Sequence, residues 1–212
     1  MTVQTQAITP VLRIRLVTQA YNSYMVLLVS AIAVILIPFA TYFILFKDMQ
    51  MSGLAIETVS EYSLSFPRKK IALQLALIFY ARAIYIFSHQ IGITLIQTDA
   101  DYLYLLITVS ALLLVILAAT LYEPIMNAHN TIGVASVIGL ILIKFAIVLP
   151  IGTSLTIQIV SAIIALFETV TYLYLLYKSH FRLTGHHEVV SVVSLALWAS
   201  MLVILNWNTL WI

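Results

Sequence analysis

The chain has 212 residues, of which 63% are hydrophobic and only 8% are charged, and its mean hydropathy is +1.08. A soluble domain carries about 25% charged residues, so this composition excludes a soluble globular fold and predicts an integral membrane protein whose main partner is the lipid bilayer. The net charge of +2 gives no reason to expect nucleic acid as a partner, and the lack of cysteine excludes disulfides and thiolate metal sites.

The first expected element is an N-terminal interfacial segment over residues 1–22. Thr9 is a suitable N-cap and Pro10 suits the first helical position, so a helix is predicted over residues 9–22. Arg13 and Arg15 exclude this helix from the hydrocarbon, which places it along the membrane surface. No uninterrupted apolar core followed by a small-residue site is present, so no cleavable signal peptide is predicted.

Six apolar segments follow, each near the length of about 20 residues that a membrane span requires. They cover residues 23–46, 71–97, 102–124, 131–151, 154–177 and 189–211. Short connections between most of them require antiparallel neighbours. The predicted fold class is therefore all-α, a polytopic bundle of six transmembrane helices forming one domain over residues 23–212. The abundance of isoleucine without cysteine also hints at a thermophile.

The one longer connection, residues 47–70, carries Glu57 and Glu61 four residues apart. This spacing suits a short solvated helix better than a pair of catalytic carboxylates.

Basic residues at the span ends predict the orientation in the membrane. Six of them flank the odd-numbered loops, namely Lys47, Arg68, Lys69, Lys70, Lys178 and Arg182. Only Arg13 and Arg15 lie on the other side. Both termini are therefore expected outside the cell membrane, although the two N-terminal arginines argue for the opposite orientation.

Three ionisable residues lie deep inside predicted spans: Arg82, Lys144 and Glu168. A charged residue at the centre of a span costs about 2.5–3.5 kcal/mol on insertion scales, so Arg82 is expected to face the interior and find a partner. At a rise of 1.5 Å per residue, the three lie about 17, 20 and 15 Å from the basic side. Their similar depth predicts an Arg82–Glu168 pair with Lys144 nearby.

Helical spacing extends this prediction to three lines of polar and small residues, each on one face of a span. They are Gln74, Arg82, Tyr85 and His89 in the second span, Gln158, Ser161, Ala165, Glu168 and Tyr172 in the fifth, and Ser191, Ser194 and Trp198 in the sixth. The predicted intramembrane polar cluster comprises Arg82, Lys144, Glu168, Tyr85, His89 and Gln158. Two cations and one carboxylate would favour an anionic ligand or a proton relay, and the alternative is a purely structural role in helix packing.

The histidines give little support for a cofactor, and the sequence assigns none. His89 has no second histidine at its depth, so a bis-histidine haem is disfavoured. His186, His187 and Glu188 are weak candidates for a divalent metal site, with His129 or Glu123 as further ligands.

No complete catalytic motif is present, and we expect no catalytic activity of the chain itself. The first functional interpretation is a non-catalytic membrane subunit of a larger complex, respiratory or energy-coupling, with other subunits or a second copy as partners. The second is a small anion or proton transporter or channel that uses Arg82, Lys144 and Glu168.

Overall fold

The computed structural model describes residues 10–51, 58–92, 101–148, 154–179 and 185–207, and within them the chain forms seven α-helices and no strand. The helices are α1 (Pro10–Met51), α2 (Val59–Leu64), α3 (Pro67–Ile91), α4 (Asp101–Ala119), α5 (Met126–Ala146), α6 (Leu155–Lys178) and α7 (Gly185–Trp207), with a 3₁₀ turn, η2 (Glu123–Ile125), before α5.

Six of these helices are long and apolar enough to cross a membrane, which confirms the predicted fold class. The candidate spans are residues Asn22–Thr41 of α1, all of α3, α4, α5 and α6, and His186–Leu205 of α7. Hydropathy in the sequence therefore located all six candidate spans of the described residues. The predicted ends at residues 93–97, 149–151 and 208–211 lie outside the residues that the structure describes.

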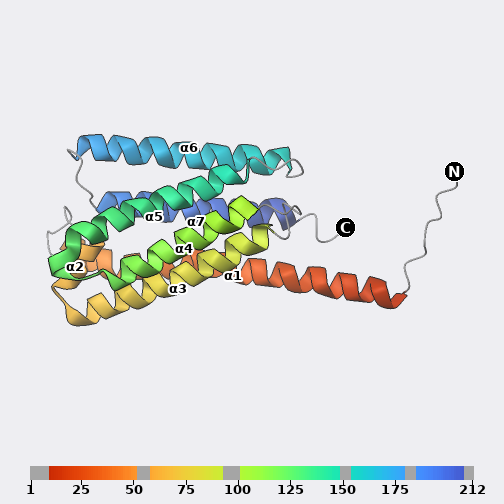
Figure 1. Cartoon of the computed structure of the whole chain (residues 1–212), viewed down its shortest axis with the longest axis horizontal. Helices are drawn as coiled ribbons and strands as arrows, with labels where there is room; N and C mark the ends of the chain where they lie inside the picture. Colours follow the sequence, from red (N-terminus) through yellow and green to blue (C-terminus); the bar gives the residue numbers. More distant parts are fainter. Residues whose placement is uncertain (1–9, 52–57, 93–100, 149–153, 180–184, 208–212) are drawn as a thin grey trace.

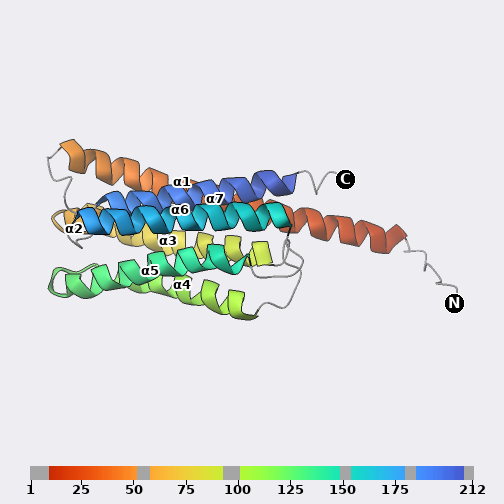
Figure 2. The ribbon, with the colours of Figure 1, turned by 90° about the horizontal axis from the view of Figure 1, so that it is seen from above.

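The six long helices form a closed ring in which each helix packs against two neighbours (Figures 1 and 2). The order around the ring is α1, α3, α4, α5, α6 and α7, and α7 packs against α1. We call one end of the ring the α2 end, because α2 lies there beside the starts of α3, α5 and α7 (Figure 1). Arg68, Lys69 and Lys70 lie at this end, at the start of α3, and Lys178 lies there at the end of α6.

Helix α1 contains both the predicted N-terminal helix and the first candidate span, which begins at Asn22. The location of the N-terminal part along the membrane surface stays a prediction. The helix begins at Pro10 as expected, but it continues without a break to Met51. Its N-terminal part extends past the other helices along the line of the first span (Figure 1). The sequence offers no reason for a turn at residue 22, because residues 16–25 contain neither proline nor glycine. Residues 1–9 are not among the described residues.

Helix α2 is the short helix predicted in the first loop, but it is buried rather than solvated. Thr58 caps it, and Thr58 and Glu61 form a reciprocal capping box. Val59, Ser60, Tyr62 and Ser63 are all buried against the bundle. Glu57 lies outside the described residues.

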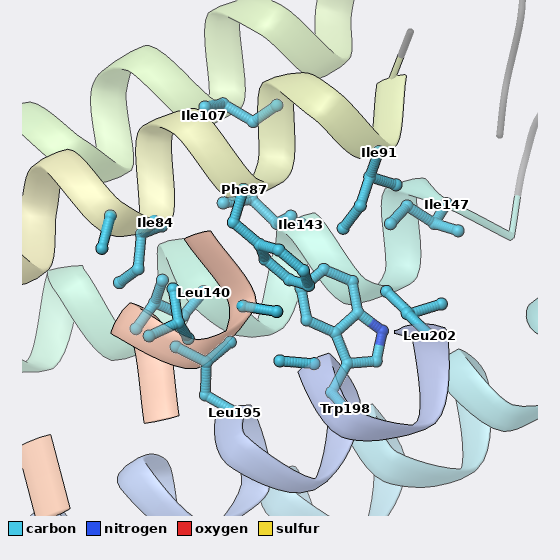
Figure 3. Close-up of a cluster of buried hydrophobic side chains, with 14 of the residues drawn as sticks. Ile84, Phe87, Ile91, Ile107, Leu140, Ile143, Ile147, Leu195, Trp198 and Leu202 are labelled. Carbon is cyan, nitrogen blue, oxygen red and sulfur yellow. The ribbon is translucent and has the colours of Figure 1, made fainter. Parts of the chain in front are cut away.

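The half of the ring away from α2 is filled by an apolar core (Figure 3). Phe87 of α3 and Trp198 of α7 meet edge to face at its centre, with ring centroids 5.7 Å apart. Isoleucine and leucine side chains from α3, α4, α5 and α7 surround them. We call this part of the core the apolar plug.

Candidate functional site: a buried ion pair beside an interior cavity

Three consecutive helices bring together a buried ion pair. Lys144 of α5, Glu168 of α6 and Ser194 of α7 meet inside the ring, and Lys144 and Glu168 have no exposed surface. The Lys144 Nζ atom donates to Glu168 Oε2 and, at 3.3 Å, to Ser194 Oγ. Ser194 Oγ in turn donates to the same carboxylate oxygen at 2.8 Å. The three side chains therefore form a closed hydrogen-bonded triangle between three helices.

This ion pair is electrically neutral, which changes the expected chemistry of the site. A buried charge pair is tolerated only when each charge has its partner and further hydrogen bonds. Ser194 supplies one such bond, but Glu168 Oε1 has no hydrogen-bond partner in the described part of the chain. With one cation and one carboxylate, the net charge of the cluster is zero, so the argument for an anionic ligand does not hold here.

The predicted pairing of Arg82 with Glu168 is wrong. Arg82 and Tyr85 are exposed on the outer face of α3, and His89 is half-buried there between the rings of Tyr85 and Tyr104. The spacing correctly placed these polar residues together on one face. The error was to assume that a polar face points inward, whereas the inward face of α3 carries Tyr80, Ile84, Phe87 and Ile91.

The other two polar lines do face the interior, as predicted. Ser161, Ala165, Glu168 and Tyr172 of α6 are buried, and so are Ser191, Ser194 and Trp198 of α7. Two hydrogen bonds connect these faces of α6 and α7. Trp198 Nε1 donates to Ser161 Oγ at 2.9 Å, and Ser194 Oγ donates to Glu168 Oε2. Gln158, at the start of the α6 line, is half-buried.

A partly open cavity of about 190 Å³ lies in the half of the ring near α2, with residues of all seven helices in its wall. Its polar lining includes Tyr80, His129, Ser136, Tyr172, His187 and Glu188. Most of the remaining lining is aliphatic, including Leu77 and Leu140. The cavity can therefore accept a small molecule that has an apolar body and a few hydrogen-bonding groups.

The cavity ends one helical turn from the ion pair. Leu140, Tyr172 and Ser191 line it, and they lie four residues before Lys144, four after Glu168 and three before Ser194. Residues three or four apart share a helix face, so the same faces of α5, α6 and α7 carry both features. The buried Ser191 hydroxyl has no hydrogen-bond partner within the described residues, which leaves it available to a ligand or to water.

Glu188 attaches α2 to the wall of this cavity. Its Oε2 atom accepts a hydrogen bond of 2.9 Å from the backbone N–H of Val59 at the start of α2. Thr58, Val59 and Ser60 also line the cavity. The Glu188 carboxylate therefore acts as a tether, and moving α2 away would open the α2 end of the cavity.

The histidines near the α2 end do not form the weakly predicted metal site. No group of three histidine, aspartate or glutamate side chains lies close enough to hold a metal ion among the residues whose side chains are described. His186 is exposed, whereas its neighbour His187 is buried with its ring edge-on to Tyr172. His129 Nδ1 lies 3.4 Å from Thr120 Oγ1, and the side chain of Glu123 is outside the described set.

Sequence reasoning missed the correct partner of Lys144, although a signal was present. The connection between α5 and α6 is short, which makes these two helices antiparallel neighbours, and Lys144 and Glu168 lie at similar depth in them. It also missed Tyr80, His129 and Ser136 as cavity residues. Of these, Ser136 was detectable, because it lies eight residues before Lys144 and so on the same side of α5.

Comparison of the chain with protein family models, curated proteins and solved structures finds no match.

Proposed function

We propose that this protein is a membrane carrier that takes up a small, mainly apolar solute into the cavity from the α2 end. The observation that supports it is the cavity itself, which is lined by residues of all seven helices and lies beside the ion pair. A purely structural bundle needs no such space, because membrane helices pack closely when they only support one another.

The solute follows from the size and lining of the cavity. A water occupies about 30 Å³ of liquid volume, so 190 Å³ suits a compact molecule rather than a sugar chain or a peptide. Hydroxyl, imidazole and carboxylate groups are present, but aliphatic side chains form most of the wall. Neutral or cationic solutes fit this lining better than anions do, since Glu188 is its acidic group and no lysine or arginine lines it.

The ion pair would couple the uptake of solute to a conformational change or to the binding and release of a proton. Lys144, Glu168 and Ser194 join α5, α6 and α7 at the boundary between cavity and plug. Relative movement of these helices must break the triangle, and protonation of Glu168 would make this easier because it removes the attraction between the carboxylate and the Lys144 ammonium. Ionisable groups at this depth serve as proton relays in many transporters.

The proposed setting is a cell membrane with the α2 end in the cytoplasm and both termini outside. The concentration of Arg68, Lys69, Lys70 and Lys178 at that end supports this orientation.

Water access to the cavity tests the proposal, and the absence of cysteine makes the test clean. Ser136→Cys places a single thiol in the cavity wall, and we expect it to react with a charged thiol reagent added from the α2 side only. Ile138→Cys, which is exposed on the outer face of α5, is the matched control and should stay unreactive in lipid. Equal reaction at both positions, or none at Ser136→Cys from either side, would contradict a one-sided aqueous cavity.

Flux through the reconstituted protein tests the carrier activity itself. Vesicles with a trapped pH dye are screened against small neutral and cationic solutes, and we expect solute-dependent proton movement for at least one class. Filling the cavity with Ser136→Phe should abolish that movement, whereas Ile138→Phe should leave it unchanged. Movement that survives in Ser136→Phe would exclude the cavity as the route.

The alternative function, a non-catalytic subunit of a larger membrane complex, is favoured by a different observation: the exposed Arg82 on the outer face of α3.

A further inference from the structure

Arg82 is a cation on the outside of the bundle. The outer face of α3, which we call the Arg82 face, consists of Ile71, Leu75, Ile78, Phe79, Arg82 and Tyr85, and all six side chains are exposed. Arg82 makes no hydrogen bond or ion pair with any residue of the described chain. A charge in this position requires a partner from outside the molecule.

The depth of Arg82 excludes water and lipid headgroups as the natural partner. Lys70 lies twelve residues before Arg82, which is about 18 Å along the helix, and Ile91 lies nine residues after it, about 14 Å. A bilayer core is about 30 Å thick, so the guanidinium starts near its centre. Both interfaces are further away than the side chain can extend, whereas arginines that reach the headgroups are found near helix ends.

We propose that the Arg82 face binds a transmembrane helix of another membrane protein that carries an aspartate or glutamate at mid-membrane depth. A carboxylate matches the guanidinium in charge and in its fork-like geometry, and the bond is strong where no water competes. Phe79 and Tyr85 flank Arg82 on the same exposed face and supply apolar surface for the neighbouring helix. The charge of this surface thus specifies the chemistry of the helix that covers it.

A second copy of this chain does not meet the requirement. Glu168 is fully buried and bound to Lys144, and Glu188 is bound to α2. Among the side chains that the structure describes, the exposed carboxylate is Asp101, at the first residue of α4 and hence at the end of a span rather than its middle. The described surface therefore offers Arg82 of another copy no acid at the right depth.

A designed peptide tests the proposal without knowledge of the natural partner. The probe is a leucine-based transmembrane peptide with one glutamate at its midpoint, labelled for energy transfer to the labelled full chain in phosphatidylcholine vesicles at neutral pH. We expect at least tenfold stronger association for this peptide than for the same peptide with glutamine. The preference should vanish in Arg82→Met and in the gentler Arg82→Gln, of which at least one must keep the wild-type helix content and monodispersity.

Two controls distinguish charge pairing from nonspecific association of hydrophobic helices. Lys70→Gln removes a cation from the end of the same helix, and it should keep the full preference for glutamate. Moving the glutamate to the end of the peptide should abolish the preference. Equal binding of the glutamate and glutamine peptides would overturn the proposal. So would self-association of the wild-type chain that disappears in Arg82→Met, because it would assign the face to a second copy. Neither result bears on the interior cavity, so the carrier proposal is tested separately.

Discussion

At the residue scale, the fully buried Lys144–Glu168 pair should be sensitive to substitution. Lys144→Met leaves a carboxylate without its cation in a fully buried site, and breaking such a pair costs about 3–5 kcal/mol. We expect this loss in the free energy of unfolding, measured by titration with a denaturing detergent. The double change with Glu168→Met removes both charges and should be markedly more stable than Lys144→Met alone.

Two matched substitutions show whether this coupling is specific. Lys178→Met removes an exposed cation at the end of α6 and should change stability by less than about 0.5 kcal/mol. Arg82→Met combined with Glu168→Met should give the sum of the two single effects, since Arg82 lies on the outer face. Coupling between Arg82 and Glu168 would restore the pairing that the sequence suggested and contradict the structure.

At the scale of single helices, the tether between α7 and α2 is testable by hydrogen exchange. Glu188→Ala removes the acceptor of the Val59 N–H bond. A hydrogen bond to a charged group contributes about 1.5–3 kcal/mol, and 1.4 kcal/mol is a factor of ten. We therefore expect exchange over residues 58–64 to rise about 10- to 100-fold. His186→Ala, at an exposed neighbouring position, should leave this exchange rate unchanged, and an equal rise there would contradict a specific tether.

The contact between α4 and α5 gives a second prediction at this scale. A Cβ atom added to Gly139 would lie 2.5 Å from Ser110 Oγ and 3.2 Å from Ser110 Cβ, so Gly139→Ala overpacks the interface and should cost about 1–3 kcal/mol. Gly133→Ala meets only Leu117 at 3.7 Å, and it should be neutral or stabilising because alanine favours helix. Ser110→Gly should rescue Gly139→Ala. An equal loss of stability in Gly133→Ala and Gly139→Ala would contradict the close approach of α4 and α5 at Gly139.

At this scale, sequence patterns predicted the helices themselves but not the direction in which each helix faces. The length of the apolar segments located all six candidate spans, because a helix in lipid must be long and apolar whatever it packs against. Spacing grouped the polar residues of α3, α6 and α7 correctly. The spacing did not show whether the polar face of α3 points inward or outward. Arg82 and Lys144 lie at similar depth, so depth alone could not decide which of the two pairs with Glu168. That choice depends on the order of the helices around the ring. The contacts of α2 could not be predicted from the first loop alone, because Glu188, which accepts a hydrogen bond from Val59, is 129 residues away in the sequence.

At the scale of the whole molecule, the cavity and the apolar plug divide the ring into two halves with different roles. One half holds space, hydroxyls and a carboxylate, and the other is filled by apolar side chains around Phe87 and Trp198. The ion pair lies where the two halves meet. This arrangement is what the proposed carrier requires, with a solute site toward the α2 end and a barrier toward the other end. The hint of a thermophile remains a prediction, because nothing in the fold bears on it.

If the apolar plug is the barrier of the proposed carrier, its removal should make the membrane leak protons. Trp198→Ala deletes a fully buried ring, and such a change costs about 3–5 kcal/mol while leaving space between the cavity and the far end. We expect vesicles with this variant to lose an imposed pH gradient several-fold faster than wild type, measured with a trapped dye. Trp198→Phe is the control, since it loses the bond to Ser161 but keeps an aromatic ring against Phe87. A leak in both variants would point to general loosening of the bundle. No leak in Trp198→Ala, with the fold intact, would show that the apolar plug is not the barrier.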